Sequence, residues 1–330
     1  MQAALNNANI KTYHVRMNNE FANKSFNKAD QYPNIVESIL RDIPDSATGP
    51  ARNFRLINAK SGVYVYKCVY ADAPAVAKYF EKEDDRRELL NYEILARQGV
   101  PTVRVYAHGK SSLVMEDISA SGDWRLGTPE DLSDARVAKG LANWYFTLHE
   151  RGEAALELDA LYFEYDCLTE KNLLGLIKVF PEAGGLYRFL LANSEKLREM
   201  IYKPKFTLAY NDFYWGNLVV RRDGSAAMML DFNLLGRGYR YSDFRNVRWD
   251  MGEDAKAAFD IEYGRLYAER HGSNRTEAEE LERRIDELAG DLFLIHLAFT
   301  EHERIPEWAK EAAESAKNGK LLIKTKRLLA

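Results

Sequence analysis

The chain has only two cysteines, Cys68 and Cys167, among its 330 residues. Two are too few for a disulfide framework, so a reducing compartment, the cytoplasm, is the simplest inference. Residues 1–30 lack the apolar core of a secretory signal, and no apolar run approaches membrane-spanning length. These absences predict a cytoplasmic protein with no membrane partner.

A large excess of charge of one sign is also missing. The 46 Lys and Arg residues against 50 Asp and Glu residues leave a formal net charge of -4, which gives no basic footprint for nucleic acid. Internal repeats and low-complexity tracts are absent too. What remains is an ordinary globular composition, 46% hydrophobic and 29% charged, in a chain long enough for two lobes.

The stretch from Phe206 to Asn246 carries the strongest chemical pattern. Asp212 is followed five residues later by Asn217, and two short apolar runs around an Asp-Gly turn then lead to Asp231. This order predicts a loop, a strand, a turn and a second strand. The hairpin would gather three oxygen-bearing side chains at one edge.

Phosphoryl transfer suits such a set of residues. It needs a metal on the nucleotide phosphates and a group that orients the attacking hydroxyl. Magnesium takes oxygen ligands, usually with one or two carboxylates, so Asn217 and Asp231 are the candidate ligands. Asp212 is the candidate catalytic residue, which accepts the proton of the substrate hydroxyl. The Asp–Asn spacing alone is weak, because both residues are common in turns.

These motifs resemble the catalytic and metal-binding segments of the protein-kinase-like superfamily. Tyr210-Asn211-Asp212 and Asp231-Phe232 resemble the aminoglycoside phosphotransferase and choline kinase branch. The stretch Tyr239 to Asn246 is similar to choline kinases, in which an Asp at the position of Asp243 braces the catalytic loop. The resemblance implies an α+β fold, with an antiparallel-sheet small lobe and a mainly helical large lobe. It also implies that ATP and magnesium serve transfer of the γ-phosphoryl group to a hydroxyl of a small molecule.

The chain departs from those families at two positions. Tyr210 stands where the branch usually has His, which leaves the bracing of the loop open. Asn233 stands where protein kinases have Gly, which argues against a protein-kinase-type switch. Asp243 follows Asp231 too soon for an activation loop, so a protein substrate is disfavoured.

The small lobe is predicted from Asn53 onward. Three strand-like runs, at 54–57, 62–70 and 74–80, are joined by short turns. The first turn holds Ser61 and Gly62 and would cover the nucleotide phosphates by its position alone, since it lacks a G-x-G-x-x-G pattern; a plain hairpin is the alternative. In the resembled families the lysine at the place of Lys78 contacts phosphate. Lys67 is a weaker competitor.

A helix over 84–98, ended by Gly99, would hold Lys78 in place. Glu88 is the preferred partner of the lysine, and Glu93 is the rival. Two further strands are predicted at 103–108 and 113–118, followed by a loop at 119–127. The stretch Met115 to Ile118 is similar to an interlobe hinge, where the backbone of Glu116 and Ile118 would read the adenine edge. Asp117 could instead cap a turn there.

Three parts follow from this reading. Residues 1–52 form an extension with one helix opening at Pro33, residues 53–118 the nucleotide-binding lobe, and residues 119–330 the catalytic and acceptor-binding lobe. The extension either packs on the small lobe or mediates a homodimer. His149, near the end of a helix over 129–151, is expected to be structural. Further helices are predicted at 168–180, 186–201, 244–251, 254–271, 276–302 and after Pro306.

The acceptor is the least determined part. Aromatic and acidic residues in the catalytic loop and on the late helices suit a cationic acceptor, aminoglycoside-like or choline-like, although core packing and solvated helix faces explain such residues equally well. They are Tyr214, Trp215, Trp249, Asp250, Glu253, Glu301, Glu303 and Trp308. The alternatives are a sugar, amino acid or lipopolysaccharide-core hydroxyl, a non-catalytic nucleotide-binding scaffold, and a helical interaction protein.

Overall fold

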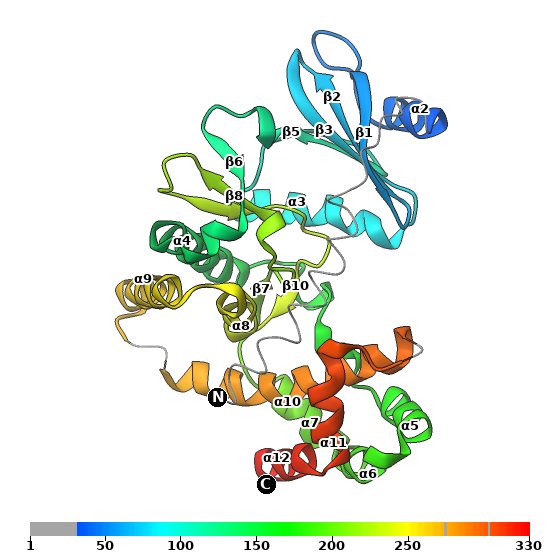
Figure 1. Cartoon of the computed structure of the whole chain (residues 1–330), viewed down its shortest axis with the longest axis vertical. Coiled ribbons are helices and arrows are strands. Elements are labelled where there is room, and N and C mark those ends of the chain that lie inside the picture. The colour runs from blue at the N-terminus through cyan, green and yellow to red at the C-terminus, as the bar shows by residue number, and fades with distance from the viewer. Residues whose placement is uncertain (1–31, 274–275, 303) are drawn as a thin grey trace.

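The computed structural model describes residues 32–273, 276–302 and 304–330. The first part of the predicted extension, residues 1–31, lies outside the described residues. The elements stack in three tiers, with a sheet at the top, a helical layer across the middle and a second group of helices below (Figure 1). The predicted α+β class, with an antiparallel sheet and many helices, is confirmed.

The upper tier is a five-stranded antiparallel sheet in the order β1-β2-β3-β5-β4. Its alternating strands bury one set of side chains, including Tyr66 and Cys68, under helix α2 (Pro33–Asp42). That packing is one of the two roles left open for the extension; the homodimer stays a prediction. The strands are β1 (Arg52–Lys60), β2 (Val63–Tyr70), β3 (Ala73–Phe80), β4 (Val105–His108) and β5 (Ser112–Glu116).

Helix α3 (Arg87–Gln98) lies under the sheet and ends as predicted at Gly99. This glycine has a φ of +65°, a left-handed conformation that favours a residue without a Cβ atom. A single turn of 3-10 helix, Asp84–Arg86, leads into α3 from the end of β3. The helix therefore begins close to the end of β3, the central strand that carries Lys78.

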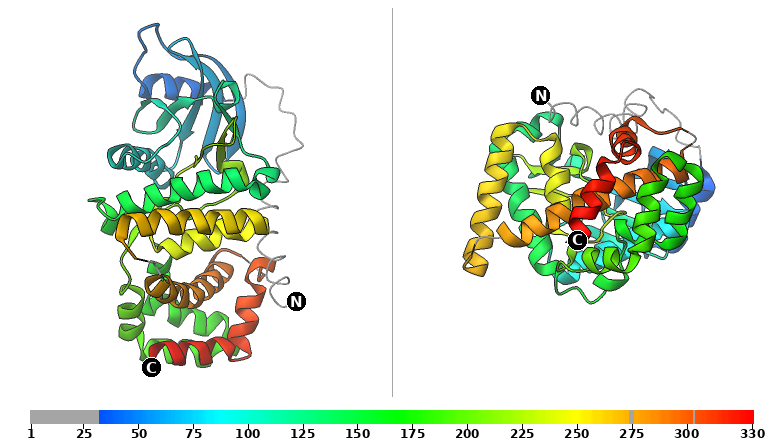
Figure 2. Two further views of the ribbon diagram at one scale, coloured as in Figure 1. Left: turned by 90° about the vertical axis from the view of Figure 1, so that its left-hand side faces the viewer. Right: turned by 90° about the horizontal axis from the view of Figure 1, so that it is seen from below.

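The middle tier positions the segments that carry Asp212 and Asp231. Helix α4 (Ala135–Gly152) runs beside α9 (Glu253–His271), as Figure 2 shows, and α8 (Arg240–Asp250) packs next to them. Two glycines let the backbone of α4 approach the small strands closely: a Cβ at Gly140 would lie 2.7 Å from the backbone nitrogen of Ala227. The strands are β6 (Trp124–Leu126), β8 (Leu218–Arg221) and β9 (Ala227–Met229) in one sheet, and β7 (Thr207–Ala209) with β10 (Gly236–Gly238) in another.

The lower tier has a hydrophobic core of its own, in which leucines such as Leu190, Leu292 and Leu321 are fully buried. Its helices are α5 (Glu170–Val179), α6 (Gly184–Ala192), α7 (Ser194–Ile201), α10 (Thr276–Glu301), α11 (Lys310–Lys317) and α12 (Lys320–Leu329). Within the described ranges, no helix combines the length and apolar character needed to cross a membrane.

Four sequence predictions need correction. The helix predicted over 186–201 is two helices separated at Asn193, and the last helix is broken at Gly319, which has a φ of +80°. The predicted loop at 119–127 contains β6. The strand predicted to reach Ile118 ends at Glu116, because the side chain of Asp117 caps the following turn by accepting a hydrogen bond from Ser119 N.

Candidate active site

Three charged side chains meet between the sheet and the middle tier. Lys78 Nζ on β3 donates to both carboxylate oxygens of Glu88 on α3, at 2.7 and 2.6 Å. It also donates to Oδ1 of Asp231, a residue that follows β9, at 3.2 Å. Glu88 is 1% exposed, while the Asp231 side chain is 35% exposed. We call Lys78, Glu88 and Asp231 the cleft cluster.

The electrostatics of the cleft cluster keep the lysine charged. Burial alone would lower the pKa of Lys78, but the carboxylates of Asp231 and Glu88 outweigh it and raise the pKa above its usual value. The two rivals lie elsewhere: Lys67 pairs with Asp117 at 2.9 Å, and Glu93 lies near Arg97 and His108. The structure thus pairs Lys78 with Glu88.

Asp212 lies on the loop between β7 and β8, close enough to Asp231 for the charge of Asp231 to affect its pKa. Burial and then the charge of Asp231 raise the pKa of Asp212 to about 7. Asn217 Nδ2 donates to the backbone oxygen of Asp212 at 3.3 Å and to its Oδ2 at 3.4 Å. A carboxylate with a pKa near the working pH is suited to accept a proton.

A buried network holds this loop from behind. Asp243 on α8 accepts hydrogen bonds from the backbone nitrogens of Tyr210 (2.9 Å to Oδ2) and Asn211 (3.1 Å to Oδ1). His149 Nε2 lies 3.1 Å from Asp243 Oδ2, and its Nδ1 lies 2.8 Å from the hydroxyl of Tyr263. A neutral imidazole protonated at Nε2 satisfies both contacts. We call Asp243, His149 and Tyr263 the loop brace; His149 is accordingly structural.

Tyr210, the residue in place of the usual His, connects the loop to the segment that leads into Asp231. Its buried hydroxyl donates to the backbone oxygen of Leu230 at 2.5 Å, directly before Asp231. Asn211 and Asp231 each have a φ of +63°, a conformation that costs non-glycine residues energy. The hydrogen bonds around them therefore hold both segments in place.

Sequence reasoning missed a second connection between the lobes. Asn91 Nδ2 on α3 donates to the backbone oxygen of Phe232 at 2.6 Å, and Tyr92 packs edge-on against the Phe232 ring at 5.0 Å between centroids. An Asn on the helix face next to Glu88 was the only available signal. These contacts fix the segment after Asp231 against α3.

The remaining predicted nucleotide contacts lie at opposite ends of the strands of the same sheet. The turn of Ser61 and Gly62 joins β1 to β2, and the carbonyl of Gly62 accepts from Glu81 N at 2.9 Å, close to the end of β3. Glu116 ends β5, and Ile118 begins a buried single turn of helix. Their contacts with a nucleotide stay predictions.

Comparison with known proteins adds the family. The chain matches the phosphotransferase enzyme family (APH) over residues 51–284. It belongs to that family. The expectation of a phosphotransferase of the aminoglycoside phosphotransferase and choline kinase group is thereby confirmed. None of the curated proteins matches this chain.

Solved structures share the fold of this phosphotransferase at low sequence identity. Ethanolamine kinase from Plasmodium vivax is 12% identical, with 96% of each chain covered and a TM-score of 0.53. The macrolide 2'-phosphotransferase MphH from Brachybacterium faecium is 15% identical over 87% of this chain and 98% of that one, with a TM-score of 0.52. LicA in complex with AMP is 13% identical over 88% and 96%, with a TM-score of 0.51; LicA is the choline kinase of Streptococcus pneumoniae.

The donor set of this phosphotransferase fits magnesium with a nucleotide. The amide nitrogen of Asn217 faces Asp212, which leaves the amide oxygen for a cation, and the Asp231 carboxylate is partly exposed. Magnesium bound by one carboxylate and the phosphates of its substrate is a common arrangement. The described residues hold no group of three or more His, Cys, Asp or Glu side chains that would bind a metal by itself.

The structure divides the residues suggested for a cationic acceptor. Tyr214 and Trp215 lie together in the catalytic loop, at 5.0 Å between ring centroids. Trp308, in contrast, is buried in a small core cluster with Ala298 and Ala309, and Glu253 is exposed at the start of α9. Glu303 and the side chain of Glu301 lie outside what the structure describes. Trp308 is therefore a core residue, and a pocket for a cationic acceptor stays a prediction.

Proposed function

We propose that this phosphotransferase moves the γ-phosphoryl group of ATP, with magnesium, to a hydroxyl of a small acceptor, and that the acceptor is a cationic amino alcohol or aminoglycoside-like molecule. The observation that carries the proposal is that Lys78, Asp231 and Asp212 lie together between the sheet and the middle tier. The AMP complex of LicA supports a nucleotide ligand, and the choline and ethanolamine kinases support an amino alcohol.

Each side chain has a distinct task in this proposal. Lys78, held by Glu88, contacts phosphate oxygens, and Asn217 with Asp231 holds the metal. Bound magnesium would neutralise charge that develops on the phosphate oxygens. Asp212 orients the acceptor hydroxyl and takes its proton, a contribution of about 10²- to 10⁴-fold in rate. Transfer depends on positioning more than on covalent help from the protein.

The test is release of ADP from Mg-ATP with a panel of amino alcohols, aminoglycosides and neutral sugars. We expect turnover with a cationic acceptor, and a fall of about 10²- to 10⁴-fold in kcat for Asp212→Asn. A rise in melting temperature with Mg-ATP, kept in the variant, would show that the cleft is intact.

Asp254→Asn is the matched control, because Asp254 is an exposed carboxylate at the start of α9. It should keep full activity. Turnover of neutral sugars alone would contradict the acceptor class, and an active Asp212→Asn variant would contradict the role of the base.

A further inference from the structure

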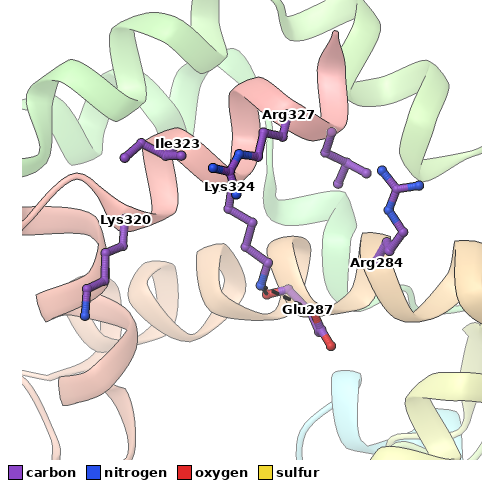
Figure 3. Close-up of a pocket in the computed structure, with 7 residues that line it drawn as sticks. Arg284, Glu287, Lys320, Ile323, Lys324 and Arg327 are labelled. Atoms are coloured by element: carbon purple, nitrogen blue, oxygen red, sulfur yellow. Dashed lines mark hydrogen bonds and ion pairs between the residues drawn. The ribbon is translucent and has the colours of Figure 1, made fainter.

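A groove between α10 and α12 lies in the lower tier, at the opposite end of the molecule from the sheet (Figures 1 and 3). Its volume is about 440 Å³, within the usual range of ligand sites. Four of its seven lining residues are cations and one is a carboxylate. The lining residues are Arg284, Glu287, Lys320, Ile323, Lys324, Arg327 and Leu328.

The positive charge in this groove is only partly balanced by neighbouring carboxylates. Glu287 is engaged by Arg283 at 2.5 Å, and Lys324 lies 3.7 Å from Glu287 and 3.9 Å from Asp291. Arg284, Lys320 and Arg327 form no ion pair with any residue that the structure describes. Like charges gathered without partners repel one another, so the folded protein alone gains nothing from them.

Buried side chains hold α12 in place. The helix is attached to the lower core through Leu321, Thr325 and Leu329, which are all buried. Among the cations, Lys324 also links α12 to α10, because it donates to the backbone oxygen of Glu287 at 2.9 Å. Lys320 and Arg327 therefore border the groove on a helix that is held in place by other side chains.

We propose that this groove binds a compact ligand carrying two or more phosphate groups. Guanidinium groups on both helices, Arg284 and Arg327, offer forked donors that match phosphate oxygens. Two lysines add point charges, and Ile323 with Leu328 adds a small apolar surface. The volume suits one small molecule. The site is separate from the cleft cluster, so its ligand is neither the nucleotide nor the acceptor.

Inositol hexakisphosphate is the probe, titrated calorimetrically into the full chain with saturating Mg-ADP to fill the cleft. We expect one site, weaker at physiological ionic strength than at low ionic strength because salt screens exposed charges. Arg284→Gln with Arg327→Gln should weaken binding at least about tenfold, since each removes a charge-assisted hydrogen bond. Lys171→Gln with Lys196→Gln is the matched control, because it removes two exposed cations from the same tier.

A second arm uses phosphatidylcholine vesicles containing phosphatidic acid, which separates a lipid headgroup from a free phosphate ester. Binding of either probe that the arginine variant loses and the lysine variant keeps supports the site. Absence of binding to both probes, equal loss in the two variants, or displacement by Mg-ADP would overturn it. Circular dichroism of the variants shows that α12 stays folded.

Discussion

The cleft cluster and the loop brace are both sets of polar side chains around a buried carboxylate, yet the carboxylates have different partners. In the cleft cluster, Glu88 accepts its hydrogen bonds from the side chain of Lys78. In the loop brace, Asp243 binds two backbone nitrogens as well as His149. A side-chain pair can be replaced as a unit, whereas backbone groups stay and need an acceptor. The first set is therefore expected to serve phosphate placement and the second the conformation of the catalytic loop.

The largest expected effect is on the loop brace. Replacing Asp243 and His149 together by leucine removes both side chains but leaves the nitrogens of Tyr210 and Asn211 buried without an acceptor. Each unsatisfied group costs about 1–3 kcal/mol, so we expect a loss of roughly 3 kcal/mol or more in the free energy of unfolding. Urea denaturation measures it. A double variant within about 1 kcal/mol of the wild type would remove the distinction between the two sets.

The cleft cluster should respond in the opposite way. Lys78→Met alone leaves Glu88 as an unpaired buried carboxyl and should cost about 3 kcal/mol. Lys78→Met with Glu88→Leu replaces the whole pair by apolar groups and should return to within about 1 kcal/mol of the wild type. The kcat/KM of this double variant should stay at least about a hundredfold below that of the wild type, because the phosphate no longer contacts the ammonium group of Lys78. Restored activity in this stable double variant would refute the placement role.

The smallest effect concerns the link between the two sets. Tyr210→Phe removes the hydroxyl that donates to Leu230, and we expect a loss of about 1–2 kcal/mol in the free energy of unfolding. Tyr187→Phe is the matched control, because the Tyr187 hydroxyl is buried and has no hydrogen-bond partner among the described residues. Removing that hydroxyl should be neutral or stabilising. Equal losses in both variants would mean that the bond to Leu230 contributes nothing specific.

The sequence indicated those contacts that follow from local patterns. Lys78 and Glu88 are 10 residues apart, on a strand and the helix that follows it, and the hairpin brings Asp231 back to Asn217. The hydrogen bond from Asn91 to Phe232 joins residues 141 positions apart, and the position of Asn91 on its helix did not predict this partner. The partner of the Tyr210 hydroxyl could not be predicted either, because a buried hydrogen bond depends on which backbone group the tertiary packing brings near.

The lower tier shows the same limit. Its helices were predicted from apolar spacing, but the interruption at Asn193 was not, since Leu190 and Leu197 on either side continue the periodicity. The short strands β6 and β10 were missed because three residues carry too little pattern. The basic groove needed the structure, because its cations come from two helices that are distant in sequence.

The bonds from Asn91 to Phe232 and Leu235 have a mechanical consequence. They attach α3 to the segment that carries Asp231. If the sheet moves relative to the two lower tiers, α3 should therefore stay with the lower tiers. The sheet would then move relative to α3, and the contact between Lys78 and Glu88 would be the place where the two shift against each other. Hydrogen exchange should accordingly show the amides of α3 opening together with those of β8 and β9, and separately from those of β1 and β2.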